Sequence, residues 1–152
     1  MKALVIYDSA YGNTEKVAQA MAEALGCEAH RVTEVQPAQL TGLDALIVGS
    51  PTQKFQPLGS IKTFVKDIPP GKLDGVKVAA FDTRIALEDA DSAILNFFVK
   101  LFGYAAKPIA DHLAKKGGEL AMPPEGFYVE GTEGPLKEGE LERAKAWVKQ
   151  IS

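Results

Sequence analysis

The residues best suited to chemistry form a short polar run near the N-terminus, Ser9-Ala10-Tyr11-Gly12-Asn13-Thr14. The hydroxyls of Ser9 and Thr14 can donate hydrogen bonds, and Gly12 allows the backbone to approach a ligand closely. The run contains no lysine or arginine. These residue types suit the binding of a phosphate group by neutral hydrogen-bond donors.

The segments on either side of this run favour the same role. Residues 3–7 are apolar, as is typical of a buried parallel strand, and the apolar residues from Val17 to Leu25 recur at helical spacing before Gly26. The run therefore leads from a strand into the first turn of a helix. Amide N–H groups in that turn lack partners within the helix, and the helix dipole favours negative charge beside them. The alternative is a polar turn that only caps the helix through Asn13 or Thr14.

The composition of the chain limits its class. Its 152 residues have the length of one domain, so we expect a single domain over residues 1–152. The hydrophobic share of 46% and the charged share of 24% are ordinary for a globular protein. A net charge of −3 without a dense basic run argues against nucleic acid as a partner. The single cysteine and the lack of a long apolar span predict a cytoplasmic protein with no membrane span.

Strands and helices alternate along the rest of the chain. Apolar runs predict four further strands at residues 28–32, 43–49, 76–81 and 119–122, the last resuming at 127–129 after Pro123-Pro124. Helical patterns cover residues 60–68, 105–116 and 140–151. This alternation predicts an α/β fold, a doubly wound parallel sheet of five strands in the order 2-1-3-4-5 with helices on both faces. In that order a ligand binds at the carboxyl ends of the first and third strands, and the polar run follows the first strand directly.

Together these segments resemble the flavodoxin family, whose first loop is rich in serine and threonine, ends in Gly-Asn-Thr-Glu and holds the phosphate of FMN. The corresponding residues are Gly12-Asn13-Thr14-Glu15, although Tyr11 stands where the family usually has threonine. Gly49-Ser50-Pro51-Thr52 after the third strand and Asp82-Thr83-Arg84 after the fourth are similar to the family's two flavin-contacting loops. With the C-terminal residues 131–136, which are similar to small bacterial and archaeal members, the resemblance covers nearly the whole chain.

The resemblance implies a flavodoxin-like fold with FMN as cofactor, no catalytic residue and no metal. The cofactor-binding residues that it implies are Ser9, Ala10, Tyr11, Gly12, Asn13, Thr14, Ser50, Pro51, Thr52, Gln53, Lys54, Phe55, Asp82, Thr83 and Arg84. Phe55 is the candidate to stack on a flavin face, or alternatively a hydrophobic plug over the sheet edge. Lys54 and Arg84 fall in the loops that flank the ring, where they would favour the reduced, anionic cofactor, or they are solvated surface charges.

The segment from Ala93 to Phe102 is apolar around nearly the whole circumference of the helix that its pattern predicts. Such a helix is usually buried or lies in an interface. It could cover the flavin ring, pack on the sheet, receive a partner, or form a homodimer through Phe97, Phe98, Leu101 and Phe102. We expect some of these four side chains in an interface, because together they exceed what one helix face can bury.

Three functions are compatible with these observations. The first is an FMN-binding electron carrier that serves redox partner proteins. The second is an FMN-dependent NAD(P)H:quinone oxidoreductase, and the third is a non-redox binding module that keeps the fold. Other functions lack their residues, since a receiver domain needs an aspartate where Gly49-Ser50-Pro51 stands and a small tyrosine phosphatase needs a cysteine in the first loop. The dinucleotide and Walker A fingerprints are also absent.

Overall fold

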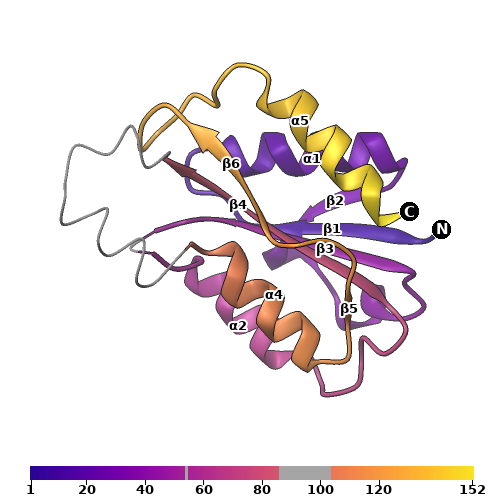
Figure 1. The fold of residues 1–152 in the computed structure, drawn as a ribbon. Coiled ribbons are helices and arrows are strands. Elements are labelled where there is room, and N and C mark those ends of the chain that lie inside the picture. The colour runs from indigo at the N-terminus through magenta and orange to yellow at the C-terminus, as the bar shows by residue number, and fades with distance from the viewer. Residues whose placement is uncertain (54, 86–103) are drawn as a thin grey trace.

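The structure, a computed structural model, describes residues 1–53, 55–85 and 104–152 (Figure 1). Its strands are β1 (Ala3–Tyr7), β2 (Glu28–Arg31), β3 (Ala45–Pro51), β4 (Lys77–Ile85), β5 (Glu119–Leu120) and β6 (Glu125–Val129). Its helices are α1 (Asn13–Leu25), α2 (Gly59–Asp67), α4 (Ala106–Lys115) and α5 (Glu140–Val148), with short 3₁₀ turns at Val32–Glu34, Pro37–Leu40 and Lys149–Ile151. In these described ranges no helix is both long and apolar enough to cross a membrane.

The strands form one parallel sheet with the predicted order. That order is β2-β1-β3-β4-β5, and β6 also pairs with β4. β5 aligns with Lys77 and Val78 at the start of β4, while β6 aligns with residues 81–85 at its end. The fifth strand is thus split into β5 and β6 around the two prolines, as the interrupted pattern predicts. The sixth strand of the sheet is the second half of this broken strand.

Side chains that alternate along the strands build two hydrophobic cores, one on each face of the sheet. In β4, Val78 and Ala80 pack on the side of α2 and α4, while Ala79 and Phe81 pack on the side of α1 and α5. Figure 1 shows this division, with α1 and α5 over one face and α2 and α4 over the other. Because helices cover both faces, the loops at the carboxyl ends of the strands are the places left for a ligand.

β4 is longer than the apolar pattern predicts. The pattern ends at Phe81, but the strand continues to Ile85. Both sides of this extension are paired, because the end of β3 aligns with Asp82 and Thr83 on one side and β6 aligns with residues 81–85 on the other. The run Asp82-Thr83-Arg84, which the sequence places in a loop, therefore lies in the sheet.

Two predictions fall outside the described residues. The apolar helix over residues 93–102, with its candidate dimer contacts Phe97, Phe98, Leu101 and Phe102, belongs to residues 86–103. Lys54 also lies outside the described residues. Both remain predictions from the sequence.

Candidate functional site

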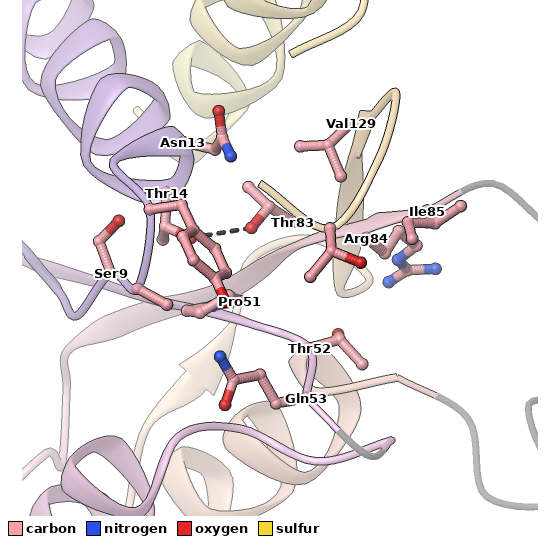
Figure 2. Close-up of a pocket in the computed structure, with 13 residues that line it drawn as sticks. Ser9, Asn13, Thr14, Pro51, Thr52, Gln53, Thr83, Arg84, Ile85 and Val129 are labelled. Atoms are coloured by element: carbon pink, nitrogen blue, oxygen red, sulfur yellow. Dashed lines mark hydrogen bonds between the residues drawn. The ribbon is translucent and has the colours of Figure 1, made fainter. Parts of the chain in front are cut away.

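A cavity of about 420 Å³ opens at the carboxyl ends of β1, β3 and β4 (Figure 2). It is lined by Ser9, Ala10, Tyr11, Asn13, Thr14, Pro51, Thr52, Gln53, Thr83, Arg84, Ile85, Val129 and Thr132. The structure thus brings together residues from the three segments that the sequence predicts as one site. Of the predicted residues that it describes, Gly12, Ser50, Phe55 and Asp82 do not line the cavity.

The first turn of α1 borders this cavity, since Asn13 and Thr14 line it. Gly12 precedes the helix with a φ of 91°, in the left-handed region that favours glycine. Its amide donates to Ser9 Oγ over 2.9 Å, which closes the loop. No side chain of the described residues caps this end of α1. The amides of Asn13 and Thr14 are therefore left for an anionic ligand, with the helix dipole in its favour.

A buried hydrogen bond joins α1 to β4 at the cavity. Thr14 Oγ1 lies 2.8 Å from Thr83 Oγ1, and both side chains are buried (Figure 2). One hydroxyl donates to the other, so the pair keeps one proton for a further acceptor. Thr14, which the sequence suggests as a donor to phosphate, thus already has a protein partner. Its hydroxyl can serve a ligand only as part of this pair.

A third wall of the cavity comes from β6 and the loop after it. Val129 and Thr132 line the cavity, and the Asn13 side-chain amide donates to the Glu133 carbonyl over 3.2 Å. Gly134 comes so close to Asn13 that an added Cβ would lie 2.6 Å from its Oδ1. The cofactor-binding residues predicted from the sequence do not include Val129 or Thr132. The glycine-rich run that follows the last strand, at the same sheet edge as the other loops, is the signal that could have indicated it.

Arg84 lies at the cavity wall with its charge already paired. Its Nε and Nη2 donate to the two carboxylate oxygens of Asp82 over 2.6 and 2.7 Å, and Asp82 Oδ2 also accepts the Ala106 amide. The guanidinium carbon lies 3.6 Å from the ring centroid of Tyr104. Burial raises the pKa of Asp82, and the bonds from Arg84 oppose that rise. Arg84 is therefore not a solvated surface charge, and its positive charge is compensated by Asp82.

The end of β3 is held by Ser50. This buried hydroxyl donates to the Pro51 carbonyl and accepts the Leu58 amide, both over 2.9 Å. A tight turn follows, in which the backbones of Gln53 and Gln56 exchange hydrogen bonds of 2.9 Å in both directions. Ser50 thus fixes the segment whose next residues, 51–53, line the cavity.

Phe55 lies at the tip of the turn and faces another cavity. Its φ is 67°, an uncommon backbone conformation for a residue with a side chain. With Pro57, Lys62 and Pro108 it lines a separate cavity of about 360 Å³ that lies between α2 and α4. The structure therefore places Phe55 apart from the residues of the main cavity.

Comparison with known proteins agrees with this fold. Residues 4–123 match the family model of the flavodoxin domain. The chain belongs to the flavodoxin family. A flavodoxin from Aquifex aeolicus is 30% identical over 132 residues, which cover 76% of this chain and 69% of that protein.

Solved flavodoxin structures share the whole fold. Oxidised Flavodoxin 2 from Bacillus cereus is similar with a TM-score of 0.78 at 22% identity, over 99% of this chain and 97% of that chain. A flavodoxin from the domain Archaea is similar with a TM-score of 0.72 at 23% identity, over 99% of this chain and 96% of that chain. These likenesses show a shared fold over nearly the full length.

The cavity of this flavodoxin-family chain fits FMN, the cofactor of the family. FMN needs a site for a phosphate anion and a slot for a flat ring. The free amides of the first turn of α1 and the neutral hydroxyls around them suit the anion. The mixed lining by Pro51, Ile85 and Val129 with polar neighbours suits a ring that is apolar on its faces and polar at its edge.

Proposed function

We propose that this chain is an electron carrier that holds FMN in the cavity at the carboxyl ends of β1, β3 and β4. The observation that carries the proposal is the N-terminus of α1, which opens into the cavity behind Gly12 without a side-chain cap among the described residues. When bound, FMN supplies one- and two-electron chemistry, and the protein binds and orients it.

The residues divide by position along the cavity. We assign the phosphate to residues 9–14, where the free amides and the Ser9 hydroxyl lie. Residues 51–53 and 83–85 then border the ring from β3 and β4. Lys54 follows in the same loop as residues 51–53 and remains a candidate for contact with the ring, whereas Phe55 lines the separate cavity between α2 and α4. Redox partner proteins would reach the cofactor at this same edge of the sheet.

A binding titration tests the proposal. FMN and riboflavin differ only in the phosphate, so their affinities for the purified chain, measured by quenching of flavin fluorescence, isolate the role of the α1 terminus. Two charged hydrogen bonds would make FMN bind roughly 100-fold more tightly. Equal affinities would contradict the phosphate assignment, and no flavin binding would leave only a non-redox binding module.

A second assay separates a carrier from a reductase. The FMN-loaded chain is mixed with NADPH and a quinone, and the oxidation of NADPH is followed at steady state. A carrier reacts only when a separate reductase is added. Turnover of NADPH by the chain alone would instead support the quinone oxidoreductase.

A further inference from the structure

A polar network beside the first loop has no role in the assignments above. It consists of Asp8, Ser9, Arg31 and Ser60, which we call the Asp8 network. The Asp8 carboxylate accepts the Ser9 amide over 2.8 Å, Arg31 Nη1 over 2.6 Å and the Ser60 hydroxyl. Arg31 Nη1 also donates to the Ser9 carbonyl over 3.2 Å. One guanidinium therefore contacts both the residue before the polar run and the first residue in it.

Sheet register explains why an arginine of the edge strand reaches this loop. Arg31 is the last residue of β2 and lies opposite Tyr7, the last residue of β1. Asp8 follows Tyr7 directly, so the two strand ends deliver Arg31 to the start of the loop. The guanidinium also lies 5.5 Å from the ring centroid of Tyr7.

The loop lies between two carboxylates, and in the described part of the chain Arg31 is the cation that contacts both of them. Asp8 and Glu15 stand at its two ends, and both carboxylates would repel a phosphate. Arg31 contacts both, with Nη2 3.9 Å from Glu15 Oε2 in addition to its bond to Asp8. Tyr7 donates its hydroxyl to the same Glu15 oxygen over 2.9 Å. The loop itself contains no cation.

The carboxylate of Asp8 stays charged in this setting. Burial would raise the pKa of Asp8, but the hydrogen bonds from Ser60, the Ser9 amide and Arg31 lower it overall. Loss of the guanidinium would leave the hydrogen bonds from Ser60 and the Ser9 amide to the Asp8 carboxylate, so at neutral pH we expect a negative charge to remain beside the phosphate site. The Asp8 side chain is only 16% exposed, so water screens it incompletely.

We propose that Arg31 is a positioning residue for phosphate binding. It fixes the start of the loop through Asp8 and Ser9, and it offsets the charges of Asp8 and Glu15 so that a loop of neutral donors can hold a dianion. This inference rests on the proposed assignment of the FMN phosphate to α1. It predicts that Arg31 affects FMN and leaves the affinity for riboflavin, which has no phosphate, nearly unchanged.

The test compares the affinities for FMN and riboflavin at low salt in the unmodified chain and in variants that change the charges of Arg31 and Asp8. We expect Arg31→Met to weaken FMN binding about tenfold, because it leaves one uncompensated carboxylate charge beside the phosphate. Asp8→Asn in the Arg31→Met background removes that charge, so it should recover most of the loss. Arg31→Lys should retain most of the affinity, and added salt should shrink the effect of Arg31→Met.

A matched control removes a cation elsewhere. Lys145 pairs with Glu23 at the far end of α1, so Lys145→Met changes the net charge equally and should alter FMN affinity less than about twofold. Equal losses of FMN and riboflavin affinity in Arg31→Met, no loss of either, or no recovery in the double variant would each overturn the inference. If the unmodified chain shows no preference for FMN over riboflavin, the phosphate assignment itself fails, and that outcome is visible before any variant is compared.

Discussion

Asn13, Thr14 and Arg84 all line the cavity while their side chains bond to the protein. Asn13 bonds to Glu133, Thr14 to Thr83, and Arg84 to Asp82. These bonds fix the side chains before a ligand arrives, which reduces the entropy lost on binding. The same bonds link α1, β4 and the loop after β6 around one cavity. Changes at these positions should therefore alter both stability and affinity.

Thr14→Val tests this double role. Valine keeps the shape of threonine but leaves the buried Thr83 hydroxyl without its partner, so the free energy of unfolding in urea should fall by about 1–2 kcal/mol. The affinity for FMN should fall by about 1–2 kcal/mol as well, because the pair no longer shares its proton with the phosphate. The control is Thr63→Val at an exposed position of α2, which should change neither quantity. A Thr14→Val variant with unchanged stability and affinity would contradict the double role.

Much of the site could be predicted at the level of residues, because the position of a loop after a parallel strand determines where its residues meet. Residues 9–14 and 51–53 follow this rule. Ile85, Val129 and Thr132 do not, since they depend on the extension of β4 and on β6. The pairing of Arg84 with Asp82 was also hidden. Two polar residues two positions apart in a sequence do not reveal that one is buried and bonded to the other.

Among the elements, β4 decides the geometry of the site. It pairs with β3 on one side and with β5 and β6 on the other. Its apolar half could be predicted from Val76 to Phe81. Its polar half could not, because Asp82 and Thr83 are buried with their polar groups bonded, Asp82 to Arg84 and the Ala106 amide and Thr83 to Thr14. A hydrophobicity pattern predicts which apolar residues are buried. It does not predict the burial of polar residues that form hydrogen bonds with each other.

Gly49, in the second half of β3, allows the neighbouring strand β4 to place the Phe81 ring against it. A Cβ added at Gly49 would lie 2.0 Å from the Phe81 ring, which is fully buried. We expect Gly49→Ala to lower the free energy of unfolding by about 1–3 kcal/mol. Gly59→Ala in α2 is the matched control, since nothing lies within 4 Å of its added Cβ, and it should be neutral or slightly stabilising. Urea unfolding in which both variants behave alike would refute the packing argument.

The carboxylate of Glu140 joins α5 to β6 through a hydrogen bond. Glu140 accepts the Tyr128 amide over 2.7 Å and pairs with Arg143, whose guanidinium lies 4.5 Å from the ring centroid of Phe127. Burial would raise the pKa of Glu140, but the bonds from Arg143 and the Tyr128 amide lower it overall. The ionised form is therefore favoured in the folded state.

This pKa shift predicts a pH dependence of stability. The pKa of Glu140 is lower in the folded chain than its unfolded value of 4.5. The ionised side chain therefore contributes to the free energy of unfolding above pH 4.5, and this contribution is lost as the pH falls through the pKa of the folded state. Glu140→Gln should be less stable than the native chain at pH 7 by about 1–3 kcal/mol. The difference should shrink as pH falls below the unfolded value. Thermal unfolding at several pH values measures it, and a difference that is constant with pH would show that the charge of Glu140 has no part in it.

For the molecule as a whole, the common direction of the parallel strands places the site and the chain ends at opposite ends of the sheet. Figure 1 shows both termini at the end of the sheet away from the carboxyl ends of β1, β3 and β4.

The electrostatic surroundings of the cavity also differ from the sequence interpretation. Arg84 is balanced by Asp82, so of the two cations expected beside the ring only Lys54 stays a candidate to favour the reduced cofactor. Self-association through residues 97–102 stays a prediction from the sequence.

The central claim is that the N-terminus of α1 receives the phosphate of FMN. A crystal structure of the chain with FMN bound tests it most directly. We expect the phosphate within hydrogen-bond distance of the Asn13 and Thr14 amides and of the Ser9 hydroxyl, with the ring between residues 51–53 and 83–85. A phosphate bound elsewhere, with these amides facing only water, would contradict the account.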